Sequence, residues 1–353
     1  MTVLETWLDG AVGETRMALV RAGTPIALAL WRASDVGRRA RWGETYAARI
    51  ASVDRRRRGA FVDLGLGAAM GFLPLDAKGG VRVAGASVAI AEGQRGFATI
   101  TREAVRAKSA VVEWRFDESA DRPGFVARHR SDEPLLDAPA AAPDVRTALD
   151  EAFEAAADPQ CLLPGGGRLI IEPTAALAAI DVDAADRPGP GDPERFALEL
   201  NLAAAEEALR QIRLRDLGGL IAIDFVSMRT PAARDAVMTA LKANKDPWGL
   251  AIAPMSRFGV VEIARPQLRR PLHEALSGAS ARETTALAAL RAIESAARAQ
   301  AGRRVVLQVQ PALEDWLQSA PFDWRDGLDR RIGRRWSMAT NAALRRPFEA
   351  FAE

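Results

Sequence analysis

The sequence is poor in the residues that make disulfides and zinc sites. Its 353 residues include one cysteine, Cys161, and two histidines, His129 and His273, which are far apart along the chain. A lone cysteine excludes an intramolecular disulfide and a cysteine-based zinc cluster. We therefore expect no zinc, and any metal site must be built from carboxylates. Such a site favours Mg²⁺, with Mn²⁺ as the alternative ion.

Long apolar runs and a strong net charge are also missing. No apolar stretch reaches the ~20 residues of a membrane span, and the N-terminus lacks the basic and apolar regions of a signal peptide. We therefore expect a cytoplasmic protein with no membrane contact. The net charge is only +2, so a basic binding surface must come from local clustering of arginines.

Apolar residues make up 48% of the chain, which is enough for more than one core, and the pattern changes along it. Residues 1–34 contain short strands, and residues 35–116 contain further strands with Gly-rich turns that predict a small β-barrel. Residues 117–166, rich in Pro, Asp and Gly around one short helical stretch, are interpreted as a connector. Residues 167–275 alternate strands and helices. Residues 276–353 continue an Ala-rich helix that starts near Leu272, followed by a strand. The predicted fold class is α/β plus a small β-barrel.

One helix of the α/β segment is predicted in detail, from about Pro193 to Arg215. Pro193 suits the first helical turn, and Asp192 is a candidate N-cap. Apolar residues at spacings of three and four place one face of this helix in a core. The predicted face consists of Leu198, Leu202, Ala205, Leu209 and Ile212.

Two aspartates stand at the ends of apolar strands on either side of this helix. Asp181 follows LAAI and Asp224 follows GLIAI, 43 residues later. A strand–helix–strand crossover makes the two strands parallel, so both carboxylates emerge at one edge of the sheet. Their mutual repulsion favours a bound Mg²⁺. The alternative is that these aspartates are helix caps or solvated turn residues. We expect Asp183 on the opposite face of the strand from Asp181 unless the strand has ended.

The predicted barrel carries a basic cluster. Between Asp35 and Gly59 there are eight arginines against three acids, with a run from Arg55 to Arg58. Arginines next to exposed aromatics bind single-stranded nucleic acid, because the arginines hold phosphates and the rings stack on bases. Two other interpretations stay open: the arginines as a solvated charge run, and Phe61 and Phe72 as barrel core. The flanking aromatics are Trp42, Tyr46, Phe61, Phe72 and Phe97.

Several strings resemble the ribonuclease E/G family. NLAAAEEALRQIRLRDLGGLIAIDFVSM is very specific to the catalytic domain of that family, and GGRLIIEPTAALAAIDVDAA and SRFGVVEIARPQLRRPL resemble its neighbouring segments. GETRMALVRAG resembles the N-terminal strands, and GETYAARIASVDRRRRGAFVDLGLGAAMGFLPL resembles the RNA-binding domain. The resemblance covers about residues 10–115 and 165–275.

This resemblance implies a metal-dependent endoribonuclease that acts on single-stranded RNA. It implies an OB-fold domain of the S1 type over residues 35–116, a DNase-I-like catalytic domain over 167–275 and a small C-terminal α/β segment. By the same resemblance, Asp181 and Asp224 hold Mg²⁺, and Asp183 is the third polar residue of the site, at a position where the family usually has Asn. Arg257 lies beside the active site, and these four residues form the implied catalytic set. The implied RNA contacts are Phe61, Phe72, Arg102 and Lys108, together with Arg55, Arg56, Arg57 and Arg58 of the basic cluster.

Two departures from the family pattern refine the expectation. The connector at 117–166 replaces the domain that senses a 5′-monophosphate, and SGASARETTA stands where the family has a zinc-binding Cys-x-x-Cys. We therefore expect cleavage without 5′-end sensing and no zinc-linked tetramer, while a homodimer through the C-terminal region stays compatible with the sequence. The alternatives are a catalytically weak or inactive RNA-binding protein, and a ribosome-assembly partner recruited through a basic C-terminal tail. The interpretation that we prefer for the arginines of this tail is a solvated surface; they are Arg330, Arg331, Arg334 and Arg335.

Overall fold

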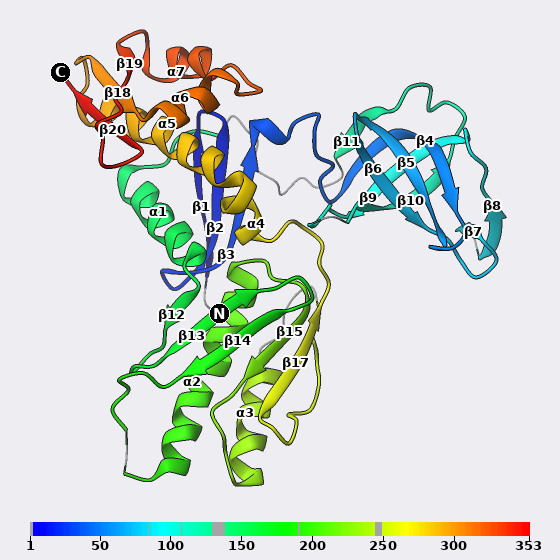
Figure 1. Cartoon of the computed structure of the whole chain (residues 1–353), viewed down its shortest axis with the longest axis vertical. Helices are drawn as coiled ribbons and strands as arrows, with labels where there is room; N and C mark the ends of the chain where they lie inside the picture. The colour runs from blue at the N-terminus through cyan, green and yellow to red at the C-terminus, as the bar shows by residue number, and fades with distance from the viewer. Residues whose placement is uncertain (1–2, 84, 107, 129–137, 190, 244–248) are drawn as a thin grey trace.

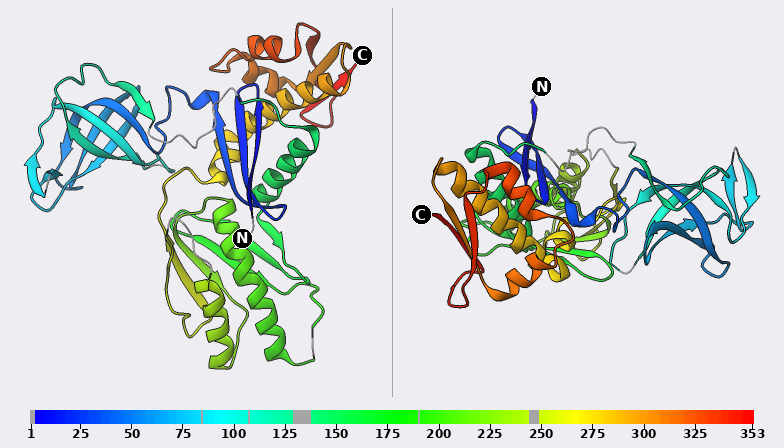
Figure 2. Two further views of the ribbon diagram at one scale, coloured as in Figure 1. Left: turned by 180° about the vertical axis from the view of Figure 1, so that it is seen from behind. Right: turned by 90° about the horizontal axis from the view of Figure 1, so that it is seen from above.

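The computed structural model describes residues 3–83, 85–106, 108–128, 138–189, 191–243 and 249–353. Figure 1 presents a body of three packed parts, with a β-barrel standing to one side. The view from above in Figure 2 separates the barrel from the body in the same way. The body consists of an N-terminal sheet, an α/β sheet with its helices, and a C-terminal unit. Within the described residues, no helix is both long and apolar enough to cross a bilayer.

The N-terminal sheet is an antiparallel meander of β1 (Leu4–Ala11), β2 (Glu14–Arg21) and β3 (Thr24–Arg32). Helix α1 (Pro143–Ala157) packs on it with Leu149 and Phe153, which share a core with Ala18, Val20 and Leu28. The short helical stretch predicted within the connector is this helix. A 3₁₀ turn (Ala33–Asp35) leads from β3 toward the barrel.

Buried ion pairs join this sheet to helices from distant parts of the chain. Asp9, whose side chain is fully buried, lies 3.1 Å from Arg16 and 2.7 Å from Arg146 of α1. On helix α5 (Ala281–Ala299), the buried Glu294 accepts the Val12 N–H at 2.8 Å and lies 3.2 Å from Arg331. Charges this deep are tolerated only when paired and hydrogen-bonded, so the network fixes the sheet against both helices.

The barrel closes through β4 (Glu44–Asp54), β5 (Gly59–Leu66), β6 (Ala69–Pro74), β10 (Ala110–Phe116) and β9 (Arg95–Arg102), with β9 returning to β4. Strands β6 and β10 run parallel and the other neighbours antiparallel, an arrangement consistent with an OB-like fold. The predicted small barrel is thus confirmed. Strands β7 (Gly80–Val83) and β8 (Ala86–Ala89) form a hairpin, and β11 (Gly124–Arg128) adds to β4.

Glu103, which follows β9, joins the barrel to the body. Its N–H donates to the Leu268 carbonyl at 2.8 Å, and its carboxylate accepts the N–H groups of Arg270 and Trp42. These contacts link the residues just before β4 and just after β9 to the segment that leaves the α/β sheet.

The α/β sheet has the strand order β12 (Gln160–Leu162), β13 (Arg168–Pro173), β14 (Ala178–Asp183), β15 (Gly219–Asp224), β17 (Val260–Arg265) and β16 (Ala251–Ile252). Strands β14 and β15 are parallel, joined by helix α2 (Pro193–Leu214). Helix α3 (Pro231–Ala243) follows β15. The Asp192 side chain accepts the Glu194 N–H at the start of α2, which confirms the predicted N-cap.

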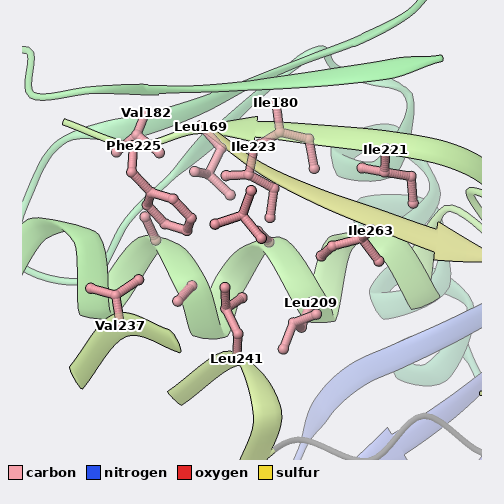
Figure 3. Close-up of a cluster of buried hydrophobic side chains, with 14 of the residues drawn as sticks. Leu169, Ile180, Val182, Leu209, Ile221, Ile223, Phe225, Val237, Leu241 and Ile263 are labelled. Atoms are coloured by element: carbon pink, nitrogen blue, oxygen red, sulfur yellow. The ribbon is translucent and has the colours of Figure 1, made fainter. Parts of the chain in front are cut away.

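One face of this sheet is buried and the other is open. Ile180, Val182, Ile221 and Ile223 point toward α2 and α3, where they meet Leu209, Leu241 and other core residues (Figure 3). Because side chains alternate along a strand, the residues between them point away from the helices. On α2 the buried face includes Leu200, Ala204 and Ala208, whereas the predicted Leu198 and Leu202 are half-buried at its margin.

The C-terminal unit packs α5 against β18 (Val305–Val309), which lies between β19 (Trp336–Thr340) and β20 (Phe348–Ala352). Helices α6 (Pro311–Gln318) and α7 (Trp324–Ile332) cover the same core. The long helix predicted from about Leu272 is in fact divided. A short α4 (Leu272–Leu276) and a 3₁₀ turn (Gly278–Ser280) precede α5, and Gly278 adopts a positive φ of 58° at the break.

Candidate active site

Asp181 and Asp224 lie directly opposite each other. The parallel register of β14 and β15 pairs Ala178 with Ile221 and, at the carboxyl ends, Asp181 with Asp224. Both aspartates are exposed and sit between buried residues, so their side chains project from the open face. The crossover through α2 therefore brings together two carboxylates that are 43 residues apart in sequence.

The carboxylates affect one another electrostatically. Partial burial, together with repulsion by Asp224 and Asp183, raises the pKa of Asp181. Within the described residues, neither Asp181 nor Asp224 forms an ion pair with a basic side chain. A cation placed between these two carboxylates would relieve their mutual repulsion.

Asp183 lies on the same open face as Asp181. The expectation that it points to the opposite face is wrong, because residues two apart on a strand share a face. Arg168 pairs with Asp183 across β13 and β14, and its guanidinium lies 2.7 Å from the carboxylate. The Ala185 N–H and Arg168 lower the pKa of Asp183. The charge of the Asp183 carboxylate is thus balanced by Arg168.

Arg257 occupies a tight turn between β16 and β17. The Gly259 N–H donates to the Ser256 carbonyl at 3.1 Å, which makes Arg257 and Phe258 the two central residues. The Arg257 guanidinium stacks on the Phe258 ring, 4.6 Å from its centroid. Val260, just after the turn, pairs with Asp224, so the turn adjoins the carboxylate pair.

Two residues that the sequence analysis missed hold the loop after β15. Asn201, fully buried on α2, donates to the Val226 carbonyl at 2.7 Å and accepts the Val226 N–H at 3.0 Å. The Glu194 carboxylate accepts the N–H groups of Arg229 and Thr230 just before α3. Asn201 is a polar residue within the apolar pattern of α2, and this departure from the pattern could have identified it.

Phe61 and Phe72 lie on the outside of the barrel. They pair across β5 and β6, with ring centroids 5.7 Å apart, while their neighbours Ala60, Val62 and Leu73 fill the core. Both rings are half-buried, so the interpretation of these residues as barrel core does not hold. Gly59 is needed beside them, because a Cβ there would lie 2.1 Å from the Phe72 ring.

Arg55 to Arg58 form the exposed turn between β4 and β5. Asp54 accepts the N–H groups of Arg56 and Arg57, and the Arg57 guanidinium lies 6.0 Å from the Phe61 ring centroid. The tetra-arginine run and the two phenylalanines are therefore neighbours on one part of the barrel.

Arg102 and Lys108 lie elsewhere, at the end of the barrel that faces the body. There they line a cavity of about 160 Å³ with Arg106, His273 and the segment 217–220. The cavity adjoins the amino ends of β14 and β15, whereas Asp181 and Asp224 are at the carboxyl ends. Burial lowers the pKa of His273, so its imidazole does not readily become charged. The structure thus separates the predicted RNA contacts into two clusters, neither beside the carboxylate pair.

The carboxylate pair is the candidate metal-binding arrangement of the described residues. Within the described ranges, no group of three or more His, Cys, Asp or Glu side chains is arranged to enclose an ion. Two carboxylates suit Mg²⁺, which keeps several waters and shares its coordination with substrate phosphates. Cys161 is half-buried against Glu207, and burial raises the pKa of its thiol to about 12, so it stays a protonated thiol.

Comparison with known proteins identifies relatives of the α/β region. Residues 125–268 match the model of the ribonuclease E/G family. The chain is 41% identical over 128 residues to ribonuclease E of Escherichia coli (strain K12), which covers 36% of this chain and 12% of that protein. It is 31% identical over 211 residues to ribonuclease E of Haemophilus influenzae, with 56% and 23% covered. A chloroplastic ribonuclease E/G-like protein of Arabidopsis thaliana is 37% identical over 125 residues, with 34% and 12% covered.

The chain thus spans between 12% and 23% of the length of these three relatives. The matched region includes both aspartates, the crossover helix between them and the Arg257 turn. The resemblance seen in the sequence is confirmed for residues 125–268, which are similar to the ribonuclease E/G family.

Proposed function

We propose that this protein is a metal-dependent endoribonuclease that hydrolyses phosphodiester bonds of single-stranded RNA. The observation that carries the proposal is the direct pairing of Asp181 with Asp224 on the open face of the sheet. The family of the matched region supports the same activity, and its curated relatives are ribonucleases by name. We further propose that the barrel is an S1-type RNA-binding domain and that the α/β region is a DNase-I-like catalytic domain.

Asp181 and Asp224 are proposed to hold Mg²⁺, with Mn²⁺ as a substitute. The unpaired charge of the two carboxylates and the raised pKa of Asp181 fit a cation between them. A bound Mg²⁺ supplies a water of lowered pKa and neutralises charge on the phosphoryl group. Asp181 and Asp224 would hold the ion at the sheet edge, and Arg257 would leave its stack on Phe258 to contact a phosphate oxygen. Asp183 holds Arg168 beside the site.

The barrel is proposed to bind the same RNA strand. Phe61 and Phe72 present half-buried rings beside the arginines of the β4–β5 turn, which suits stacking of bases and pairing with phosphates. Arg102 and Lys108 border the cavity next to the α/β sheet, so a strand held there continues along the open face toward the carboxylates. From Leu220 to Asp224 this path is about 13 Å long, at ~3.3 Å per residue.

The proposal is tested with a fluorescent single-stranded oligoribonucleotide of mixed sequence. We expect cleavage with Mg²⁺, no cleavage with EDTA, and 5′-phosphate ends on the downstream fragments. Tight binding without cleavage in either Mg²⁺ or Mn²⁺ supports the second candidate, an RNA-binding protein without catalysis. The presence of Asp183 at a position where the family usually has Asn motivates that candidate.

Asp183 is expected to contribute little to the rate. Arg168 already balances the charge of Asp183. Asp183→Asn therefore removes only one partner of a partly exposed ion pair. Such pairs are worth up to ~1 kcal/mol, so kcat/KM is expected to stay within about fivefold of wild type. Steady-state cleavage of the same oligonucleotide measures this. A loss of a hundredfold would make Asp183 a metal ligand after all.

The 5′ end of the substrate is expected not to matter. Residues 129–137 of the predicted connector lie outside the described residues, and the described parts are β11, α1 and β12, which pack against the neighbouring sheets. Substrates with a 5′-hydroxyl and a 5′-monophosphate should therefore give kcat/KM values within about twofold, which corresponds to ~0.4 kcal/mol. Parallel time courses decide this, and a tenfold preference for the monophosphate would contradict it. We also propose a homodimer, and analytical ultracentrifugation measures the oligomeric state.

A further inference from the structure

Phe258 is a large apolar side chain left in solvent next to the proposed catalytic carboxylates. Phe258 is 73% exposed, although it belongs to a tight turn within a well-packed domain. Among the ring interactions of the described residues, Phe258 contacts only the Arg257 guanidinium. Single exposed apolar residues are common on protein surfaces, but this one adjoins the paired carboxylates, and its position there suits contact with a bound ligand.

Hydrogen bonds within the turn hold the Phe258 backbone in place. The Ser256 hydroxyl accepts the N–H groups of Phe258 at 3.3 Å and Val260 at 3.2 Å, and the Ser256 N–H donates to the Val260 carbonyl at 2.9 Å. Gly259 closes the turn with φ of 92°, a conformation that side chains rarely adopt. Its carbonyl accepts the Phe225 N–H at 3.4 Å, which fastens the turn to the residue that follows Asp224.

The turn also fixes how far the ring lies from the carboxylates. Val260 is paired with Asp224 across β15 and β17, which puts their Cα atoms about 5 Å apart. Phe258 is two residues further along the chain, a span of at most ~7 Å. The Phe258 Cα therefore lies within about 12 Å of the Asp224 Cα. A nucleotide whose phosphate is at the carboxylate pair has its own base, or that of its neighbour, within reach of the ring.

We propose that Phe258 is a nucleobase-binding platform beside the scissile phosphate; the inference rests on the proposed endoribonuclease function. Arg257 covers one side of the ring, and the other side is available to stack on an unpaired base. The π-faces of all four bases suit such a platform, so it selects for single-stranded character and not for sequence. When Arg257 moves to a phosphate, both faces of the Phe258 ring become available. Arg257 then holds a phosphate while Phe258 holds a base of the same strand.

The experiment combines Phe258→Ala with single abasic positions in the oligoribonucleotide. Phe351→Ala is the matched control, because Phe351 is also exposed but lies on β20 in the C-terminal unit. For wild type, we expect an abasic nucleotide at one position flanking the cleaved bond to lower kcat/KM about tenfold, as the loss of one base stack does. For Phe258→Ala, the intact substrate should show that same loss, and the abasic substitution should cost nothing further at that position. Phe258→Trp, which keeps an aromatic ring, should cleave the intact substrate at close to the wild-type kcat/KM.

The same comparison is made for binding in EDTA, where no cleavage is needed. We expect Phe258→Ala to raise the Kd of the intact oligonucleotide about tenfold and to leave the Kd of the matching abasic oligonucleotide unchanged. The platform is disproved if Phe258→Ala and Phe351→Ala bind alike, or if every abasic position carries the same penalty in wild type and Phe258→Ala. Failure of the endoribonuclease function gives a different result. In that case Asp224→Asn does not change cleavage, whereas the difference in Kd between wild type and Phe258→Ala persists.

Discussion

Replacement of Asp224 by asparagine is expected to reduce RNA cleavage by roughly a thousandfold or more. The substitution keeps the shape of the side chain but removes one of two negative charges that face each other across β14 and β15. A neutral amide binds Mg²⁺ weakly, and the several kcal/mol of charge stabilisation at the phosphoryl group are lost with the ion. Cleavage of the fluorescent oligonucleotide at saturating Mg²⁺ measures the effect. Asp181→Asn should behave in the same way.

The control for this prediction is Asp235→Asn, which removes an exposed carboxylate on α3 in the same domain. It should cleave at the wild-type rate. Because Asp224 is exposed and unpaired within the described residues, its replacement should leave the thermal unfolding curve and the Kd for RNA in EDTA unchanged. A variant that binds RNA normally and still cleaves at the wild-type rate would remove the carboxylate pair from the mechanism.

Replacement of Asp9 by alanine is expected to lower the free energy of unfolding by roughly 3–5 kcal/mol, the usual effect of breaking a buried ion pair. Asp9 is fully buried, and its loss leaves the guanidinium groups of Arg16 and Arg146 without their shared partner. It also leaves the Ala141 N–H without its acceptor. Urea denaturation followed by tryptophan fluorescence measures the change. Asp9→Asn, which keeps an acceptor oxygen, should fall between alanine and wild type.

The matched control is Asp326→Ala, which breaks an exposed ion pair with Arg330 on α7 and should cost less than ~1 kcal/mol. The pH dependence gives a second measure. Burial alone raises the pKa of Asp9, but the hydrogen bonds and charge of Arg146 outweigh it, and the pKa is lowered overall. Its contribution is therefore present above the unfolded-state pKa of ~3.9 and is lost as the pH falls through the folded-state value. Asp9→Ala should lack this loss, and an unchanged acid transition would contradict the assignment.

Local sequence signals were sufficient for most of the elements that position the site. Asp192 and Pro193 mark the start of α2 because capping and a fixed proline φ act within one turn. Apolar runs ending in Asp181 and Asp224 predicted the two strands, and the right length of crossover predicted that they are parallel. These inferences hold because each depends on neighbours along the chain or on a general rule of strand connection.

Other features depend on contacts between distant residues and could not be predicted. The pairing of Arg168 with Asp183 requires the register of β13 against β14, and the burial of Asp9 requires an arginine 137 residues away. The division of the long C-terminal helix near Gly278 reflects how α4 and α5 pack on different neighbours. The exposure of Phe258 runs against the tendency of phenylalanine to be buried, so only the packed structure reveals it.

The central position of β15 has a consequence for synthesis of the protein. Asp181 leaves the ribosome well before Asp224, and the two become neighbours only when β15 takes its place between β14 and β17. Chains emerge N-terminus first and complete such non-local pairings slowly. A nascent chain that ends before about residue 265 thus carries its β-barrel but only half of the carboxylate pair in a finished sheet. Under the proposed activity, the growing chain therefore completes its carboxylate pair only after the last strands of the sheet have been made.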